Sequence, residues 1–252
     1  MNCTEIIFSP TGGTKRAADI LANGLAADCG IVDLSDAAVD LSGDTMKDCD
    51  IAVIAAPSFG GRVPELAIRR LSQINGQGIK AVVLCVYGNR AYEDTLLELS
   101  DAAKQVGFQV IAGVAAVAEH SIAHQYAAGR PDAQDEAVLK DFAGKIAQKL
   151  AEDKREEPKL PGNCPYKKGG AGVVPKAGSA CTACGRCAAR CPAQAISKTD
   201  FKQTDASKCI SCMRCVAECP AKARSVSKLI LQGVSVALKK ACSVRKECEL
   251  YL

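Results

Sequence analysis

The residues that most directly suggest chemistry are eight cysteines in the C-terminal part of the chain. They form two copies of the pattern C-x2-C-x2-C-x3-C-P: Cys181, Cys184, Cys187 and Cys191, then Cys209, Cys212, Cys215 and Cys219. Three thiolates spaced by three residues in a tight loop can face one iron–sulfur cube, but the fourth ligand must come from elsewhere. Structural zinc, the alternative, usually takes two separated C-x2-C pairs. The spacing therefore favours iron–sulfur clusters.

The two cysteine patterns belong to an internal repeat. Residues 181–197 align without a gap on residues 209–225, and ten of the 17 positions are identical. The segment 179–225 resembles the bacterial two-cluster ferredoxin family, which implies two [4Fe–4S] clusters that each take one ligand from the other copy. The resemblance assigns one cluster to Cys181, Cys184, Cys187 and Cys219, and the other to Cys209, Cys212, Cys215 and Cys191.

The repeat departs from that family at one aligned pair of residues. Ile196 aligns with Arg224, whereas the family usually has an apolar residue in both places. An arginine beside a cluster changes the solvation of the cluster and raises its reduction potential. We therefore expect the two clusters to differ.

A second chemical signal lies near the start of the chain, where residues 9–14 (SPTGGT) separate a short apolar run from a helical pattern. Hydroxyls and free N–H groups at a helix N-terminus form an anion site, although Ser and Thr also serve as ordinary helix caps. The loop lacks the G-K-[ST] of a Walker motif. It resembles the flavodoxin signature [TS]-x-T-G-x-T. The resemblance implies that the phosphate of FMN is held by Ser9, Thr11, Gly12, Gly13 and Thr14.

Two further loops, 56–64 and 87–92, follow the third and fourth predicted strands. Ligands of open α/β sheets bind at the carboxyl ends of the strands. Both loops resemble those that enclose the flavin ring in flavodoxins, where an aromatic side chain stacks on the ring and glycine lets the backbone approach. The residues implied are Pro57, Ser58, Phe59, Gly60, Tyr87, Gly88, Asn89 and Tyr92. Phe59, Tyr87 and Tyr92 are the stacking candidates; for Phe59 and Tyr92 the alternative is that the ring anchors the following helix.

Five apolar runs alternate with helical patterns in the first part of the chain. The runs end at Phe8 or cover 30–34, 50–56, 79–87 and 108–118, and the helical patterns cover 14–27, 64–74, 91–106 and 133–151. Such alternation predicts βαβ units and a parallel sheet, for which the flavodoxin-like order 2-1-3-4-5 is one common solution. The predicted fold class is α/β, a doubly wound five-stranded parallel sheet plus a small α+β two-cluster ferredoxin domain.

Composition divides the chain into segments. We expect a flavodoxin-like FMN-binding domain at 1–152, a linker rich in charge, Pro and Gly at 153–178, a ferredoxin domain at 179–225 and a helical tail at 226–252. Residues 1–152 carry 13 Lys and Arg against 20 Asp and Glu (net −7), and residues 153–252 carry 19 against 8 (net +11). Such asymmetry suggests that the halves dock or that the basic half meets an acidic partner. As a whole, the chain resembles the flavodoxin–ferredoxin fusions common in anaerobic bacteria and archaea.

Other features of the sequence limit the possible functions and the cellular location. The chain starts without a secretory-signal pattern, and no apolar run reaches the length of about 18 residues that a membrane span needs, so we expect a cytoplasmic protein that does not enter a membrane. In a reducing compartment, clustered cysteines act as ligands rather than disulfides. Nucleic acid is not an expected partner, because the basic half has few aromatic residues for base stacking. His120 and His124 have the spacing of a metal-binding pair, but the sequence offers no third ligand. We interpret them as polar loop residues.

We expect an electron-transfer iron–sulfur flavoprotein, with FMN and two [4Fe–4S] clusters, that converts between one- and two-electron steps and has no dedicated catalytic residue. Its expected partner is a redox protein, which is acidic on one interpretation of the charge asymmetry. Two alternatives remain open. One is a ferredoxin whose flavodoxin-like part is an empty docking platform. The other is a flavin-dependent reductase of a small organic acceptor, with Tyr87 or His120 as proton donor.

Overall fold

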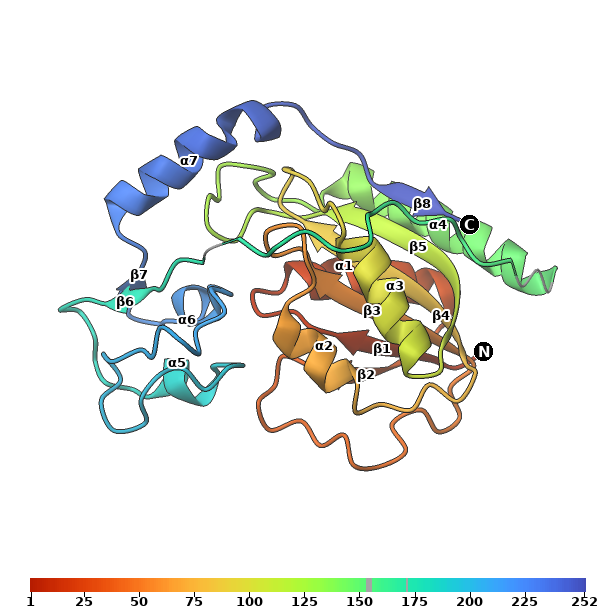
Figure 1. Ribbon diagram of the computed structural model, residues 1–252, viewed down its shortest axis with the longest axis horizontal. Coiled ribbons are helices and arrows are strands. Elements are labelled where there is room, and N and C mark those ends of the chain that lie inside the picture. The colour runs from red at the N-terminus through yellow and green to blue at the C-terminus, as the bar shows by residue number, and fades with distance from the viewer. Residues whose placement is uncertain (153–155, 171) are drawn as a thin grey trace.

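The computed structural model describes residues 1–152, 156–170 and 172–252 (Figure 1). Residues 153–155 and 171 of the predicted linker lie outside the described residues. Strands and helices alternate over residues 1–152, as the apolar runs predict. The elements are β1 (Cys3–Ile7), α1 (Gly13–Leu25), β2 (Cys29–Asp33), β3 (Ile51–Pro57), α2 (Glu65–Leu71), β4 (Lys80–Tyr87), α3 (Thr95–Gln105), β5 (Gln109–Val117) and α4 (Ala133–Ala151).

The parallel strands lie in the order β2-β1-β3-β4-β5, which confirms the predicted flavodoxin-like order. β1 is flanked on both sides, with Ile6 opposite Val32 of β2 and Ile54 of β3. The residues of β3, β4 and β5 are almost all buried, as expected for strands that helices cover on both faces. All five strands therefore end at the same edge of the sheet, where the loops with the predicted binding residues begin.

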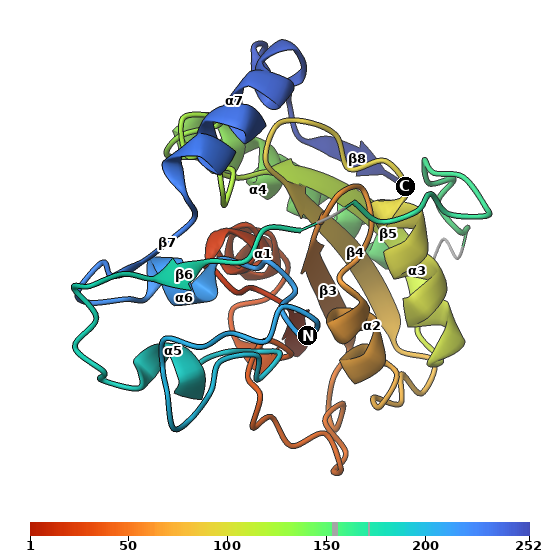
Figure 2. The same cartoon turned by 60° about the vertical axis from the view of Figure 1, so that its left-hand side comes forward.

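Helices pack on both faces of the sheet (Figures 1 and 2). α1 and α4 cover one face and contribute Leu21 and Phe142 to its core. α2 and α3 cover the other face and contribute Leu71 and Leu99. Along each helix, apolar residues recur every three or four positions and form one stripe. This amphipathic pattern determines which side of the helix packs against the sheet.

The C-terminal part begins with β6 (Lys176–Ala177), which pairs antiparallel with β7 (Arg224–Ser225). Two one-turn helices, α5 (Arg186–Ala189) and α6 (Arg214–Ala217), lie between these strands in sequence, one in each copy of the repeat. Figure 1 shows this part beside the sheet, with α7 (Lys228–Cys242) rising from it.

The end of the chain returns to the sheet. β8 (Glu249–Tyr251) pairs antiparallel with β5, with Leu250 opposite Val114. The tail is therefore helical only over α7, and the prediction of a helical tail does not hold for its last residues. β8 covers the edge of β5, whose N–H and C=O groups would otherwise lack partners. The complete sheet has six strands, in the order β2-β1-β3-β4-β5-β8.

The described part of the predicted linker is attached to α3. Tyr166 Oη donates a hydrogen bond to the Asp101 carboxylate (2.5 Å), and the backbone N–H of Lys167 donates to the Asp94 carboxylate (2.7 Å). Leu160 packs against the core on the α2–α3 face. These contacts hold the segment along the sheet domain. Among the described residues, no helix combines the length and the apolar character that a membrane crossing requires.

Candidate functional site

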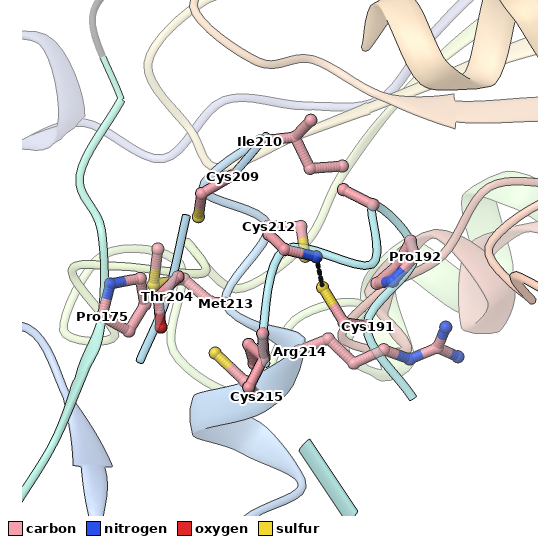
Figure 3. Close-up of a pocket in the computed structure, with 13 residues that line it drawn as sticks. Pro175, Cys191, Pro192, Thr204, Cys209, Ile210, Cys212, Met213, Arg214 and Cys215 are labelled. Atoms are coloured by element: carbon pink, nitrogen blue, oxygen red, sulfur yellow. Dashed lines mark hydrogen bonds between the residues drawn. The ribbon is translucent and has the colours of Figure 1, made fainter. Parts of the chain in front are cut away.

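The eight cysteines of the repeat gather in two cavities. The inner cysteine cavity is lined by Cys191, Cys209, Cys212 and Cys215, and the outer cysteine cavity by Cys181, Cys184, Cys187 and Cys219 (Figure 3 shows the inner one). Each cavity thus receives three cysteines from one copy of the repeat and the last cysteine from the other copy. This is the grouping that the resemblance to two-cluster ferredoxins implies. The packing of α5 against α6 brings the two copies together.

Both copies shape their cavity with residues in the left-handed region. Ala183 and Gly185 in the first copy have φ of 54° and 73°, and the aligned Ser211 and Met213 have φ of 57° and 61°. Left-handed residues alternating with others turn successive backbone N–H groups toward the inside of a loop, where they can surround an anion. The two loops therefore have matching backbones, although three of these four positions are not glycine.

Backbone N–H groups also donate to the sulfur of the last cysteine in each copy. Ala195 N lies 3.3 Å from Cys191 Sγ, and Ala223 N lies 3.2 Å from Cys219 Sγ. Burial acts to raise the pKa of Cys219, but backbone N–H donors outweigh it and the pKa of this thiol is lowered. Hydrogen bonds to sulfur stabilise the thiolate and are one way in which proteins tune iron–sulfur clusters.

Two thiols of the inner cavity would remain protonated without a metal. Burial raises the pKa of Cys212 to about 12 and that of Cys215 to about 11. Iron ligation requires thiolates, and a bound cation supplies the positive charge that ionises them. Four sulfurs in a cavity with N–H donors and an apolar wall therefore fit a [4Fe–4S] cluster.

The two cavities differ in how deeply they lie in the protein. Cys212 of the inner cavity is buried, whereas the aligned Cys184 of the outer cavity is exposed. The same difference holds for the aligned arginines. The Arg214 side chain is 6% exposed and donates to Ser35 O (2.8 Å), whereas the Arg186 side chain is 59% exposed. The second copy of the repeat is therefore the one that faces the sheet domain.

Arg224, the residue that departs from the ferredoxin family, is buried in the wall of the outer cysteine cavity. It is 3% exposed, and its guanidinium donates to Thr204 Oγ1 (3.0 Å) and to Phe201 O. Burial raises the pKa of Cys215 in the inner cavity, and the charge of Arg224 opposes this rise; the same charge helps to lower the pKa of Cys219 in the outer cavity. One buried cation therefore acts on both cysteine sets.

A third cavity, the central pocket, lies where the sheet domain meets the C-terminal part. Its volume of about 540 Å³ is in the range of small-molecule and cofactor sites. Four regions line it: the loops that follow β1, β3, β4 and β5, the Cys209–Cys212 loop of the inner cysteine cavity, one side of α7, and the linker residues Gly170, Gly172 and Val173. The pocket is thus built at the carboxyl ends of parallel strands, where open α/β sheets bind ligands.

Most of the predicted flavin residues line the central pocket. Nine of the thirteen do so: Thr11, Gly13, Thr14, Pro57, Ser58, Phe59, Gly60, Tyr87 and Gly88. They come from the three predicted loops, so the structure brings all three together. The aromatic rings available at the pocket are those of Phe59 and Tyr87, which suit stacking on a planar ligand.

The end of the pocket next to α1 suits an anion. Gly12 precedes the helix with φ of 92° and has no side chain to cap α1, and no side chain of the described residues accepts the N–H of Gly13 or Thr14. Thr11 and Thr14 line the pocket here. Ser9 and Gly12 are not in the lining; Ser9 Oγ instead accepts a hydrogen bond from the N–H of Lys15 (2.8 Å) and shapes the loop. Free N–H groups at the positive end of a helix favour a phosphate.

Asn89 and Tyr92, two further predicted flavin residues, hold the C-terminal segment instead of lining the pocket. The Asn89 amide donates to the carbonyls of Cys242 (3.0 Å) and Val244 (2.9 Å). Tyr92 Oη donates to the Glu249 carboxylate of β8 (2.6 Å). The sequence analysis proposed that Tyr92 stacks on the flavin ring. In the structure its hydroxyl binds β8 and its ring packs against Tyr87.

His120 lies in the pocket wall beside Gly88. His120 Nδ1 accepts hydrogen bonds from the N–H groups of Ile122 (3.2 Å) and Ala123 (3.1 Å), which leaves Nε2 to carry the ring proton. Burial lowers the pKa of His120, so the ring is neutral at pH 7. A side chain at position 88 would come within 2.7 Å of the ring, so this approach requires glycine. His124 instead pairs with Glu119 at the surface (2.7 Å).

The sequence analysis missed three parts of the pocket wall. One is the side of α7 that carries Val234, Ala237 and Leu238. Their spacing of three and four residues predicts one face of a helix, but no local pattern locates that face over a distant pocket. The second is the Cys209–Cys212 loop, whose cysteine spacing predicted only iron ligands. The third is the predicted linker, which contributes Gly170, Gly172 and Val173.

Comparisons with known proteins find a family model for the C-terminal part and similar solved structures that cover about 60% of the chain. Residues 180–224 match the family model described as a 4Fe-4S dicluster domain. The chain is similar to a flavodoxin of Streptococcus pneumoniae TIGR4 (21% identity, 59% of this chain and 99% of that chain, TM-score 0.44). It is also similar to the rubredoxin oxygen:oxidoreductase of Desulfovibrio gigas (18% identity, 60% of this chain and 36% of that chain, TM-score 0.47). No curated protein matches it.

The family match implies two [4Fe–4S] clusters, and the matched segment contains eight cysteines, the number of thiolates that two such clusters take. The remaining strands form a sheet of flavodoxin-like order with a cofactor-sized pocket at its carboxyl edge. The chain therefore combines a sheet of flavodoxin-like strand order with a segment that matches the 4Fe–4S dicluster family model.

Proposed function

We propose that this protein is an electron carrier that passes electrons between two [4Fe–4S] clusters and one FMN. The observation that carries the proposal is a shared wall: the Cys209–Cys212 loop lines the inner cysteine cavity and also lines the central pocket. A cluster in the cavity and a flavin in the pocket would contact the same three residues, Cys209, Ile210 and Cys212. Such closeness favours direct electron transfer between them.

The cysteine sets of the inner and outer cavities are the proposed cluster ligands. The proposed FMN has its phosphate at the N-terminus of α1, beside Thr11 and Thr14, and its ring near Phe59 and Tyr87. Helix dipole and free N–H groups support the first placement, and the aromatic rings support the second. The titles of several similar structures name flavodoxins, which agrees with this assignment.

FMN, when bound, exchanges electrons singly or in pairs and so connects one-electron carriers with two-electron chemistry. The residues of this chain have simpler tasks. The cysteines hold the clusters, the helix terminus holds the phosphate, and α7 limits the access of water to the pocket. His120 is neutral and keeps its Nε2 proton, so it can donate a hydrogen bond to a ligand in the pocket.

The same histidine supports a second candidate function, the reduction of a small organic acceptor at the flavin. A buried, neutral donor in the wall of a pocket suits general acid chemistry. The two functions differ in what oxidises the reduced protein. A carrier returns its electrons to one-electron proteins, whereas a reductase returns them to an organic molecule at a rate that falls when His120 is replaced by Gln.

We further infer that an acidic one-electron protein carrier docks at the outer cysteine cavity. Cys184 is exposed there, and Arg186 (59% exposed) lines the same cavity. Arg190 (46% exposed) also lies at this end, where it contacts Glu218 beside the cysteine Cys219. Complementary charge raises association rates, and salt screens the effect. Electron delivery by an acidic ferredoxin should therefore slow as salt increases, while delivery by an uncharged reductant should not.

Chemical analysis of anaerobically purified protein tests the proposed function. We expect about eight iron and eight acid-labile sulfide per chain, and one flavin that acid releases as FMN. After rapid reduction of the clusters, the flavin absorbance should bleach without further reductant. A colourless, zinc-containing protein without sulfide would refute the iron–sulfur assignment, and an iron–sulfur protein that binds no flavin would favour the empty docking platform.

A further inference from the structure

We propose that the two clusters act in a fixed order, in which the inner cluster is the immediate electron partner of the flavin and the outer cluster receives electrons from outside. This inference rests on the proposed function. Each step moves one electron: the carrier is oxidised as the outer cluster is reduced, and the inner cluster is then reduced by the outer one. The inner cluster is oxidised as the flavin is reduced. A second passage completes the reduction of the flavin, with protons taken from solvent.

The lining of the central pocket is the first argument for this order. Cys209, Ile210, Ser211 and Cys212 belong to it, and two of them are inner-cluster ligands. None of the described residues that line the outer cysteine cavity belongs to it. The outer cavity instead opens where Cys184 is exposed. The two clusters therefore occupy unequal places, one against the flavin pocket and one at the surface.

The contacts between the two parts of the chain are the second argument. Arg70 of α2 donates to the carbonyls of Leu34 (2.5 Å) and Pro192 (2.8 Å), and Pro192 directly follows the ligand Cys191. Arg214, between two inner ligands in the sequence, donates to Ser35 O (2.8 Å). Both chain segments that would hold the inner cluster are thus fixed to the sheet domain.

Ser211 provides the third argument. Its Oγ is buried and has no hydrogen-bond partner among the described residues, although the residue lines the central pocket. A Cβ at Gly172 would lie 2.0 Å from this oxygen, so only glycine fits there. The hydroxyl is thus covered by Gly172, and the residue forms a part of the pocket wall that the inner loop supplies. The aligned Ala183 of the outer loop is exposed instead.

Removing one cluster at a time tests the order. Cys187 and Cys215 occupy the same place in the two copies of the repeat, so Cys187→Ala and Cys215→Ala form a matched pair that removes the outer or the inner cluster. Each variant, with FMN bound, is reduced by a short pulse of photoreductant, and the flavin absorbance is followed. We expect Cys187→Ala to keep fast flavin reduction. In Cys215→Ala the flavin should be reduced only at the rate of direct reaction with the reductant. The reverse result would overturn the order, as would equal slowing in both variants.

A second pair of variants keeps every ligand, in case loss of one cluster disturbs the other. Ser211→Asn and Ala183→Asn change aligned positions, and Asn tolerates the left-handed backbone found at both. Ser211→Asn should weaken FMN binding about tenfold, because the larger side chain enters the central pocket. Ala183→Asn should leave FMN affinity unchanged, and both should keep about eight iron. Unchanged FMN affinity in Ser211→Asn would contradict the inference.

The two proposals can fail separately. If the unaltered protein holds both clusters and FMN but shows no internal electron transfer, the proposed function is wrong. If it transfers electrons internally but loses this ability only in Cys187→Ala, the function holds and the order of the clusters is wrong.

Discussion

At the scale of single residues, the pair Ile196 and Arg224 makes the two halves of a duplicated segment chemically unequal. Arg224 is buried, its guanidinium is held by Thr204 and Phe201, and its Nε has no partner among the described residues. A buried cation is poorly screened by solvent. Each electron that a cluster accepts makes it more negative, so a fixed positive charge nearby favours the reduced state.

We therefore expect Arg224→Gln to lower the reduction potential of at least one cluster. Gln keeps hydrogen-bond donors while removing the charge. The shift should be on the order of 59 mV, which corresponds to a tenfold change in a one-electron equilibrium. Redox titration followed by electron paramagnetic resonance measures it. Arg186→Gln, at a side chain that is 59% exposed, is the control and should shift the potentials much less. Equal shifts in the two variants would contradict a special role of the buried charge.

Glu5 of β1 should make the stability of the protein depend on pH. The residue is 2% exposed, and its Oε2 has no partner among the described residues. Burial and then the charge of Asp19 raise the pKa of Glu5 from 4.5 to about 7, against the opposing effect of Lys15. The unfolded chain loses this proton near pH 4.5, whereas the folded protein keeps it until about pH 7. The free energy of unfolding should therefore fall as pH rises from about 4.5 to 7.

Glu5→Gln should remove this pH dependence. At pH 8 we expect the variant to be more stable than the unaltered protein by roughly 1–3 kcal/mol, and at pH 5 the two should be similar. Thermal unfolding under anaerobic conditions at both pH values measures the difference. The exposed Glu65→Gln serves as control. If the difference in the free energy of unfolding between Glu5→Gln and the unaltered protein is the same at pH 8 as at pH 5, the raised pKa of Glu5 is disproved.

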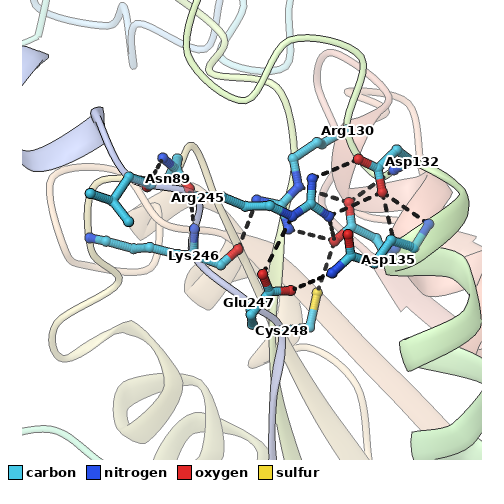
Figure 4. A network of polar contacts seen from close by, with 10 residues as sticks. Asn89, Arg130, Asp132, Asp135, Arg245, Lys246, Glu247 and Cys248 are labelled. Atoms are coloured by element: carbon cyan, nitrogen blue, oxygen red, sulfur yellow. Dashed lines mark hydrogen bonds and ion pairs between the residues drawn. The ribbon is translucent and has the colours of Figure 1, made fainter.

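At the scale of elements, the segment after α7 is held by polar contacts from distant parts of the chain (Figure 4). Arg130 and Asp135 form a buried ion pair, and Arg130 also donates to Lys246 O (2.8 Å). Arg245 pairs with Asp132 (2.7 Å) and with Asp135 (3.1 Å). These contacts fix the chain between α7 and β8, and thereby fix the side of α7 that covers the central pocket.

Asn89 is the residue on which this segment depends most. It is 3% exposed, it donates to two carbonyls, and its Oδ1 accepts the N–H of Lys246 (3.1 Å). Asn89→Ala would leave these backbone groups unpaired, at about 1–3 kcal/mol each where they stay buried. We expect faster hydrogen exchange of residues 243–251 and no loss of iron. The exposed Asn75→Ala should not change the exchange. Unaltered exchange in Asn89→Ala would mean that the ion pairs alone hold the segment.

The elements also show what a sequence can predict here. β3, β4 and β5 follow from apolar runs, because burial on both faces of a sheet favours apolar residues all along a strand. The cysteine grouping follows from spacing and resemblance. The contacts of Asn89 and Tyr92 could not be predicted in this way, because their partners Cys242 and Glu249 lie more than 150 residues away in the sequence. Local patterns carry no information about such contacts, and the edge strand β8 was missed for the same reason.

At the scale of the whole molecule, the opposite charges of the two halves meet in specific ion pairs. Lys167 pairs with Glu93 (2.6 Å), and Arg245 pairs with Asp132 (2.7 Å). Each pair joins a basic residue of the C-terminal half to an acidic residue of the N-terminal half. Part of the charge asymmetry therefore serves contacts within the chain. At the outer cysteine cavity, Arg186 and Arg190 share the single carboxylate of Glu218 and stay 59% and 46% exposed, so they can still meet a partner.

If the inner cluster donates to the flavin, the transfer rate should depend on how firmly the two parts of the molecule are docked. Arg70 connects them through Leu34 O and Pro192 O without touching either cavity's cysteines. A hydrogen bond from a charged donor contributes roughly 1.5 kcal/mol, so Arg70→Ala should shift the balance between docked and undocked forms about tenfold. We expect slower flavin reduction after the clusters are reduced, with unchanged iron and FMN content. The neighbouring Arg69 is exposed, so Arg69→Ala removes the same charge without this contact and should leave the rate unchanged. Equal rates in Arg70→Ala and the unaltered protein would show that docking does not limit the transfer.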